Sequence, residues 1–299
     1  MKKYMRNLSP IVVFAYNRLV HLKKTINSLK KCNLSKHSKL IIYLDNSKNQ
    51  NEKKKIIKVK KYCLKIKGFK EIKLVEREKN LGMSKNIILG VGQTLKKFKK
   101  GIFLEDDMLL DKYFLEYMNY YLDLYKDNNK IASIHGYSYP TKKNLPSFFF
   151  LKGADCWGWG TWSRAWRLYN DDSKKLSSQL HSKKLIKKFN FNDSYDYFKM
   201  LRKNLIVKNN SWAINWYASC FLKNKLTLYP GFSLVHNFGN DLSGTNCEET
   251  EVFNVELKNK PLKFTHAKTL ESEYAKKQFE LFFLSIMTLK KRFIRYFSV

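Results

Sequence analysis

Apolar runs alternate with segments of helical periodicity along the first half of the chain. Short apolar runs predict buried strands, and apolar residues spaced three or four positions apart predict helices. The predicted strands are Pro10–Tyr16, Lys39–Leu44, Glu71–Val75, Ile102–Leu104 and Ile131–His135. The predicted helices are His21–Lys31, Glu52–Gly68, Ser84–Phe98 and Phe114–Lys126. Strands that alternate with helices predict an α/β fold, in which helices flank a mixed, mostly parallel sheet.

Polar residues follow directly after several of these strands. Asn17 and Arg18 follow the first strand, Asp45 follows the second, and 105–107 (Glu-Asp-Asp) follow the fourth. Ligands of open parallel sheets bind beside the carboxyl ends of the strands. We therefore expect these residues to share one ligand-binding edge.

The densest chemical signal is the sequence GIFLEDDMLL at residues 101–110. Consecutive carboxylates at the end of a buried strand repel one another unless a cation lies between them. Carboxylate oxygens suit Mg²⁺ and Mn²⁺, and these ions bridge diphosphate oxygens. A solvated acidic turn is the alternative, but the apolar sequence on both sides favours a metal site.

Composition and charge narrow the function classes. The chain has 299 residues, of which 44% are hydrophobic and 15% aromatic, and this is enough for a packed core rather than a disordered chain. The formal net charge is +33. Most of the basic residues are lysines, whereas arginine is preferred for bidentate recognition of phosphates and bases, so the composition argues against nucleic acid. An anionic membrane or a phosphorylated substrate explains the charge equally well.

Cysteine spacing and hydropathy indicate a cytoplasmic protein. The five cysteines are widely spaced and form no C-x-x-C pair, which favours reduced thiols over disulfides or a zinc site. The apolar run at 11–15 is too short for a signal peptide, and no uncharged run is long enough to span a bilayer.

The order of the motifs resembles a known enzyme family. PIVVFAYNR, YLDNS, EKNLGMSKN and FLEDDM are similar to the nucleotide-sugar-binding half of GT-A glycosyltransferases. GADCWGWGTWSRAW and SWAINWYASCFLKNKLTLYPGFSLVHNFGNDLSGTNC resemble bacterial family 2 enzymes related to N-acetylglucosaminyltransferase I. The resemblance implies a GT-A domain at 1–265, with a nucleotide-sugar half at 10–140 and an acceptor half at 141–265. A basic amphipathic helix region at 266–299 follows.

The resemblance also implies roles for residues of the donor half. It places Tyr16, Asn17 and Arg18 around the nucleotide, where Arg18 can present a planar fork of donors to a diphosphate. Asp45 would accept a hydrogen bond from the base or ribose, although an ordinary turn aspartate is an equal alternative.

A second donor-side motif is the loop before the third helix. Gly82 permits close approach of the backbone, the N-terminus of the following helix favours phosphate, and Lys85 adds positive charge. Asn80 stands in the same loop, and a simple capped turn is the alternative interpretation.

The implied metal is Mn²⁺ or Mg²⁺. The family pattern makes Asp107 the direct ligand, while Glu105 and Asp106 would act through water, ribose or sugar hydroxyls. His236 would complete the metal shell, as a late histidine does in many GT-A enzymes. A structural histidine is the alternative.

The base that deprotonates the acceptor hydroxyl has two candidates, Asp155 and Asp241. In N-acetylglucosaminyltransferase I the base lies in an acidic segment of W-D-D-W type. The corresponding residues here, Trp212–Trp216, contain no carboxylate, so the sequence leaves both the base and the choice between inversion and retention open.

Two aromatic segments are expected to contact ligands. Glycines separate the tryptophans in Trp157–Trp162, which leaves ring faces available for stacking on sugars, and core packing is the alternative. Phe279–Phe297 is basic and aromatic, and its apolar stripe predicts a helix in a membrane interface, with a terminal helix packed on the domain as the alternative. The stripe consists of Phe279, Phe282, Phe283, Ile286 and Met287.

The sequence thus predicts a metal-dependent glycosyltransferase at the inner face of the cytoplasmic membrane. It would move a hexosyl or N-acetylhexosaminyl group from a nucleotide-sugar, for which a UDP-sugar is the expectation, to an acceptor hydroxyl. The acceptor would be a cell-surface glycan such as lipopolysaccharide or capsule, or a lipid-linked molecule. The alternative is a non-catalytic basic protein that binds nucleic acid or an anionic membrane.

Overall fold

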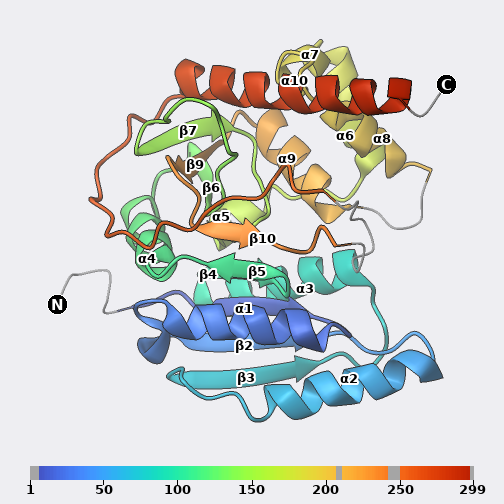
Figure 1. Ribbon diagram of the computed structural model, residues 1–299, viewed down its shortest axis with the longest axis vertical. Helices are drawn as coiled ribbons and strands as arrows, with labels where there is room; N and C mark the ends of the chain where they lie inside the picture. The colour runs from blue at the N-terminus through green and yellow to red at the C-terminus, as the bar shows by residue number, and fades with distance from the viewer. Residues whose placement is uncertain (1–6, 207–210, 242–249, 297–299) are drawn as a thin grey trace.

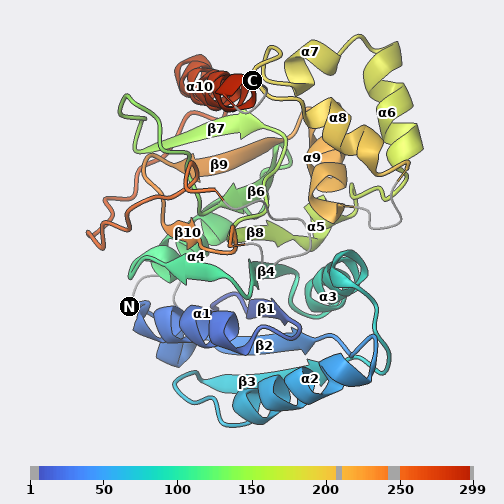
Figure 2. The same ribbon diagram turned by 45° about the vertical axis from the view of Figure 1, so that its right-hand side comes forward.

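The computed structural model describes residues 7–206, 211–241 and 250–296, with backbone alone from residue 288. A mixed eight-stranded sheet runs through the described chain (Figure 1), in the order β3-β2-β1-β4-β8-β6-β9-β7, which can be followed by the labels in Figure 2. Its strands are β1 (Ile11–Ala15), β2 (Lys39–Leu44), β3 (Glu71–Glu76), β4 (Lys100–Glu105), β6 (Ile131–His135), β7 (Phe148–Lys152), β8 (Trp159–Trp162) and β9 (Leu226–Pro230).

The four strands β3, β2, β1 and β4 form the parallel half of the sheet. β1 pairs Ala15 with Leu44 of β2 and Phe14 with Glu105 of β4, so the three strands end at one edge. β1, β2 and β4 are apolar and buried apart from their ends, as strands covered on both faces should be, whereas the edge strand β3 is partly exposed along its length. The fold class is therefore confirmed, and the residues that follow these strands lie at one edge, whose role in ligand binding stays a prediction.

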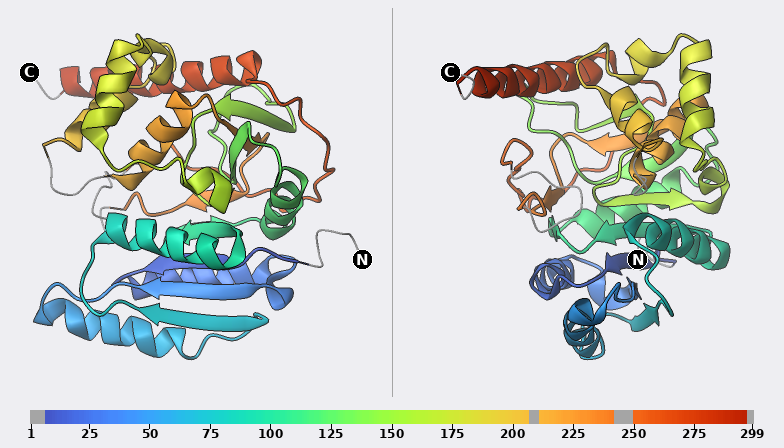
Figure 3. Two further views of the ribbon diagram at one scale, coloured as in Figure 1. Left: turned by 180° about the vertical axis from the view of Figure 1, so that it is seen from behind. Right: turned by 90° about the vertical axis from the view of Figure 1, so that its right-hand side faces the viewer.

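Helices cover both faces of the parallel half. α1 (Leu19–Lys31) and α2 (Gln50–Cys63) lie on one face, and α3 (Met83–Phe98) lies on the other (Figure 3). α2 ends five residues before the predicted Gly68, because Lys65 and Ile66 turn back to donate hydrogen bonds to Tyr62 and Cys63. The mixed half follows α4 (Phe114–Leu124), and its strand β8 runs antiparallel to both β4 and β6.

A second, two-stranded sheet lies beside the end of β4. β5 (Met108–Leu110) pairs antiparallel with β10 (Val235–Asn237), and the backbone N–H of Phe238 donates to the Asp107 carbonyl at 3.0 Å. This pairing brings a segment from late in the chain directly against the carboxylate run, and the sequence analysis did not predict it.

A cap of helices packs on the outer part of the mixed half (Figure 2). It consists of α6 (Ser173–Ser182), α7 (Ile186–Phe189), α8 (Tyr197–Lys203), α9 (Trp212–Leu222) and α10 (Glu273–Tyr296), while the short helix α5 (Ser163–Trp166) directly follows β8. Most apolar side chains of the cap form a second cluster, in which Phe279 of α10 contacts Tyr229 of β9, whereas Trp212 and Trp216 of α9 belong to the main core.

Two expectations about aromatic segments are wrong for most of their residues. Trp159 and Trp162 lie in β8 with their side chains buried in the core, so their ring faces do not reach a ligand, although Trp157 is partly exposed. The apolar stripe of α10 also faces the protein, because Phe279, Phe283 and Ile286 are buried. Within the described residues, no helix is long and apolar enough to cross a bilayer.

Candidate active site

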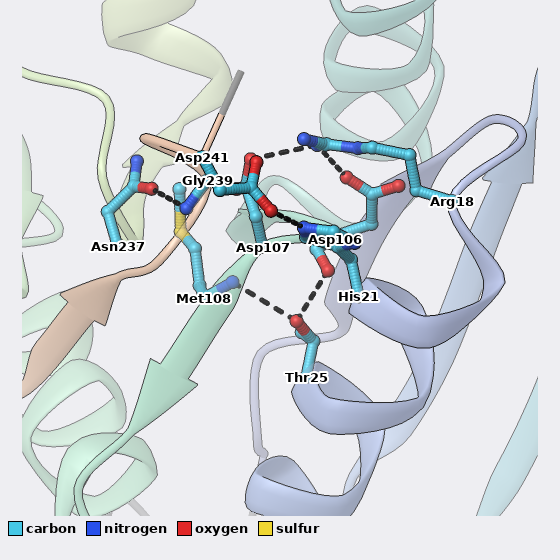
Figure 4. Close-up of polar contacts among 9 residues, drawn as sticks. All are labelled: Arg18, His21, Thr25, Asp106, Asp107, Met108, Asn237, Gly239 and Asp241. Atoms are coloured by element: carbon cyan, nitrogen blue, oxygen red, sulfur yellow. Dashed lines mark hydrogen bonds and ion pairs between the residues drawn. The ribbon is translucent and has the colours of Figure 1, made fainter. Parts of the chain in front are cut away.

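Arg18 joins two carboxylates at the end of β4. Its Nη2 donates to Asp107 Oδ2 at 2.8 Å and also to Asp106 Oδ1. Figure 4 shows the guanidinium reaching both side chains from the start of α1. Arg18 is placed there because β1 and β4 are adjacent and parallel, so the residues that follow them meet. The predicted arginine therefore lies at the carboxylate cluster.

Thr25 of α1 fixes the turn that carries these carboxylates. Its hydroxyl donates to the Asp106 carbonyl at 2.7 Å and accepts from the Met108 backbone N–H at 3.1 Å (Figure 4). Thr25 is completely buried, so both polar contacts are made away from water and hold the turn firmly. The sequence analysis missed this residue, since nothing in its local pattern links it to the acidic run.

The cluster carries more negative charge than Arg18 neutralises. Burial raises the pKa of Glu105, and the charges of Asp107 and Asp106 raise it further. Burial likewise raises the pKa of Asp106, although Arg18 opposes this. A pKa raised by neighbouring carboxylates indicates a site where an additional cation is favourable.

Two oxygens of the cluster fit a metal ion. Asp106 Oδ2 and Asp107 Oδ1 are buried and have no hydrogen-bond partner among the described residues. No group of three His, Cys, Asp or Glu side chains in the described parts of the chain forms a complete metal shell. Mg²⁺ and Mn²⁺ are commonly held by one or two carboxylates, with phosphates and water supplying the other ligands, so this pair fits such an ion.

The segment after β10 lies against Asp107. Asn237 Oδ1 accepts from the Gly239 N–H at 2.8 Å, and a side chain at Gly239 would collide with the Asp107 carboxylate. Asp241 then pairs with Nε2 of His21 at 2.8 Å, and the ring of His21 stacks on Phe238 at a centroid distance of 5.3 Å. Asp241 is thus a neighbour of the cluster but is already paired, and its side chain is 44% exposed.

His236 has a different environment. Its Nδ1 accepts from the Val255 backbone N–H at 3.3 Å. Burial lowers the pKa of its imidazole, and the hydrogen bond with Val255 opposes this. The ring is therefore favoured in its neutral form, which is the form that ligates metals. Its role as a metal ligand stays a prediction.

Asp45 organises the predicted phosphate loop. Its Oδ1 accepts from Leu81 N at 2.9 Å and from Asn46 N at 2.9 Å, and its Oδ2 accepts from Gly82 N at 2.8 Å and from Asn80 Nδ2 at 3.3 Å. A carboxylate offers about four acceptor positions, so this one is largely occupied. The sequence analysis assigned Asp45 to the base or ribose and Asn80 and Gly82 to a separate phosphate loop, whereas in this structure Asp45 contacts that loop; the nucleotide roles stay predictions.

Three further donor-side residues lie around the same edge. Tyr16 donates through its hydroxyl to Glu52 of α2, and Asn17 donates to the other oxygen of that carboxylate at 3.4 Å. Lys85 is exposed in the first turn of α3. Their roles in nucleotide binding stay predictions.

The loop between β7 and β8 carries Asp155. The antiparallel register of β4 and β8 pairs Phe103 with Trp159, so the residues just before Trp159 run alongside the end of β4. Burial raises the pKa of the neighbouring Cys156 thiol, and the charges of Asp155, Glu105 and Asp107 raise it too. The loop that carries Asp155 therefore reaches the carboxylate cluster, and Cys156 lies close enough to both for their charges to act on its thiol.

Both oxygens of Asp155 have partners. Oδ1 accepts from the Cys156 backbone N–H at 3.0 Å, and Oδ2 accepts from the Tyr139 hydroxyl at 3.3 Å. Asp155 is partly buried, whereas Asp241 is exposed. Tyr139 follows β6 with no local signal of function, and the sequence analysis missed it.

Comparison with known proteins gives fold-level and family-level results. The structure of S. aureus TarS 1-349 is similar with a TM-score of 0.42 and 15% identity, over 77% of this chain and 60% of that chain. A second S. aureus TarS structure is similar with a TM-score of 0.41 and 16% identity, over 77% of this chain and 36% of that chain. The structure of mannosyltransferase PcManGT from Pyrobaculum calidifontis, in complex with GDP-Man and Mn²⁺, is similar with a TM-score of 0.33 and 9% identity, over 44% of this chain and 35% of that chain. The chain therefore spans less than two thirds of each of these structures.

No curated protein sequence matches the chain. The family model described as glycosyl transferase family 2 matches residues 11–206, which is more than half of the sequence. This range contains the parallel half of the sheet, the carboxylate cluster and Asp155. The chain belongs to glycosyl transferase family 2 and has the mixed, helix-flanked sheet of the GT-A fold.

Proposed function

We propose that the protein moves a sugar from a UDP-sugar to an acceptor hydroxyl, with a divalent cation at the carboxylate cluster and Asp155 as the general base. The observation that carries the proposal is the position of Asp155 on the loop before β8, where its neighbour Cys156 lies near Glu105 and Asp107 at the edge where the parallel strands end. Carboxylates in these two roles are what metal-assisted transfer from a diphosphate donor needs.

Donor binding is proposed along the ends of β1, β2 and β4. Asp45 holds the Asn80–Gly82 loop in place, and Lys85 supplies positive charge to the same region. Tyr16 lies at the end of β1 and offers an aromatic ring to the nucleotide. Arg18 is proposed to exchange one of its carboxylate partners for a diphosphate oxygen, because its planar fork suits either anion.

Asp106 and Asp107 would hold Mn²⁺ or Mg²⁺ through their two oxygens that lack other partners. The ion would neutralise negative charge on the nucleoside diphosphate as it departs. His236 is proposed as an additional ligand through Nε2, because its Nδ1 is already engaged by Val255.

Asp155 is preferred to Asp241 as the base, because it is less exposed and its two hydrogen bonds leave acceptor positions on both oxygens, whereas Asp241 pairs with His21 and is 44% exposed. In the proposed step the acceptor oxygen attacks the anomeric carbon, its proton passes to Asp155, and the bond to the nucleoside diphosphate breaks. A single displacement of this kind inverts the anomeric configuration, so the anomer of the product tests it directly.

The acceptor is proposed to be a surface glycan or a lipid-linked oligosaccharide, and the donor sugar a hexose or N-acetylhexosamine. The charge of +33 supports contact with an anionic membrane, proposed here as the inner face of the cytoplasmic membrane. The outward face of α10 adds support, because Leu281 and Leu284 are 47% and 44% exposed there. The apolar stripe that the sequence suggested for this contact instead packs mostly against the protein.

The test is a screen of nucleotide-sugars for hydrolysis and transfer, with Mn²⁺ and with EDTA. Asp155→Asn is expected to lower the transfer kcat by roughly 10²-fold or more with donor affinity retained. Asp193→Asn is the matched control, because Asp193 is exposed and has a positive φ that asparagine tolerates. A loss in Asp241→Asn without a loss in Asp155→Asn would move the base to the later segment, and full activity with EDTA would remove the metal.

A further inference from the structure

A chain of tyrosine hydroxyls leads from the helical cap to Asp155. The Tyr139 hydroxyl donates to Asp155 Oδ2 at 3.3 Å and lies 3.5 Å from the Tyr197 hydroxyl. Since Tyr139 uses its proton on the carboxylate, Tyr197 is the donor in the second contact. Tyr197 is the first residue of α8, so the chain connects the cap with the acceptor side of the site.

α10 fixes the ring of Tyr139. The rings of Phe279, Phe282 and Phe283 lie at centroid distances of 4.8, 5.5 and 4.9 Å from it. Phe279 and Phe283 are buried, so two of these contacts are parts of a packed core. Such a packed aromatic set has few alternative rotamers, and this holds the hydroxyl of Tyr139 in one place.

The contacts to Asp155 fix its orientation without blocking it. The Cys156 N–H binds one oxygen and the Tyr139 hydroxyl binds the other, so the carboxylate plane is held from both sides. Each carboxylate oxygen can accept about two hydrogen bonds, so capacity remains for the proton of an acceptor hydroxyl. A general base that is held in its reactive orientation accepts the proton faster than a base that samples many orientations.

We propose that Tyr139 is a positioning residue for sugar transfer, and that α10 completes the acceptor side of the active site by holding Tyr139 against Asp155. The inference rests on the proposed role of Asp155 as the base. It assigns the C-terminal helix a part in turnover, whereas the sequence suggested membrane attachment or packing alone.

The first test is Tyr139→Phe, which keeps the ring and removes the hydroxyl. We expect the transfer kcat to fall by about three- to tenfold, the effect of one hydrogen bond, with the acceptor KM and the donor affinity unchanged. Tyr62→Phe is the matched control, because the Tyr62 hydroxyl is buried without a hydrogen-bond partner among the described residues. An equal loss in both variants, or a change in KM alone, would overturn the proposal.

The second test addresses α10. Phe282→Ala removes a ring beside Tyr139, and Glu273→Ala truncates an exposed residue of the same helix. Phe282→Ala is expected to lower kcat, and Glu273→Ala is not. In the double variant with Tyr139→Phe, the loss should be clearly less than the product of the single losses, because both changes act through the same hydroxyl. Independent, multiplying losses would contradict this.

Asp155→Asn, measured beside these variants, distinguishes a failure of the proposed base from a failure of the proposed positioning role of Tyr139. If it leaves transfer intact, the proposed base is wrong. If it abolishes transfer while Tyr139→Phe keeps the full kcat, the base stands and the positioning role fails. Should Tyr139→Phe unfold, Tyr197→Phe replaces it, since that change removes only the donor to Tyr139, and unchanged kcat in that variant would count against the chain.

Discussion

The proposed donor and acceptor halves of the site are built in different ways. In the proposed donor half, the candidate side chains follow directly after β1, β2 and β4, and the parallel register alone brings them together. In the acceptor half, Asp155 stands on a loop and is held by a tyrosine from another segment. A site at parallel strand ends is encoded locally, whereas a site on loops depends on packing between distant elements.

The helical cap illustrates the second kind of construction. Its cluster joins Phe149 of β7, Tyr217 of α9 and Phe279 of α10, and it contacts the site through Tyr139. No residue of this cluster carries charge, so its contribution is geometric. Substitutions in the two halves should therefore differ in effect. Those in the donor half should remove a ligand or a charge, and those in the acceptor half should let a reactive side chain adopt more orientations.

The largest effect is expected for Asp107→Asn in the donor half. An amide is a poorer ligand than a carboxylate, so transfer should fall by about 10³-fold and Mn²⁺-dependent nucleotide binding should disappear. Calorimetric titration of nucleotide with and without Mn²⁺, together with thermal unfolding, measures this. Normal Mn²⁺-dependent binding in a folded variant would show that the carboxylate does not hold the ion.

The contact between Gly239 and Asp107 should give the next effect. Gly239→Ala places a methyl group against the carboxylate, so we expect at least a tenfold loss of transfer and weaker apparent metal affinity. Gly92→Ala is the control, because a side chain there meets nothing closer than 4.0 Å and alanine favours a helix. Equal activity of the two variants would mean that the segment moves away from Asp107 during turnover.

Two tryptophans sharpen the comparison within the acceptor half. Trp159→Ala should lower the free energy of unfolding by about 3–5 kcal/mol, because its side chain is buried in the main core. Trp157→Ala should cost less stability, since Trp157 is partly exposed, and should act on the acceptor KM. Urea denaturation and acceptor titration distinguish these outcomes, and equal stability losses would refute the distinction.

The smallest effect concerns pH and His135. Burial lowers the pKa of His135, although the charge of Asp155 opposes this, and its Nε2 accepts from the Trp157 N–H at 3.0 Å. The native state therefore binds this proton less well than the unfolded state, whose pKa is about 6.5. The contribution of His135 to the free energy of unfolding is therefore fully present above the unfolded-state pKa, and it is lost as the pH falls towards the native-state pKa.

His135→Asn should remove this dependence. Urea denaturation at about pH 7.5 and pH 5.5 should show a loss of stability at the lower pH in the parent protein that is smaller in the variant. An identical pH dependence in both proteins would place the titrating group elsewhere.

Local sequence patterns were sufficient for most of the donor half. Lys39–Leu44 and Ile131–His135 form strands with the predicted bounds, and the carboxylates lie at a strand end as expected. β8 was missed because its residues, Trp-Gly-Thr-Trp, show no strand-like alternation and read equally well as a ligand-binding loop. For α10 the periodicity indicated the helix and its apolar face but not what that face covers.

The partners of the site residues could not be predicted from local patterns. Arg18 and Asp106 are 88 positions apart, and His21 and Asp241 are 220 positions apart. Such pairs depend on which strands and helices become neighbours. Asp155 was recognised as a candidate from its residue type and neighbours in sequence, but Tyr139 became visible only through packing.

The carboxylate of Asp45 has a thermodynamic consequence for donor binding. Its oxygens accept hydrogen bonds from Leu81, Gly82 and Asn80, as the oxygens of a bound anion would. The loop is therefore ordered before any ligand binds. A nucleotide that binds there need not bear the entropy cost of ordering the backbone. The heat capacity change of binding should then reflect buried nucleotide surface alone, without the larger signature of coupled folding.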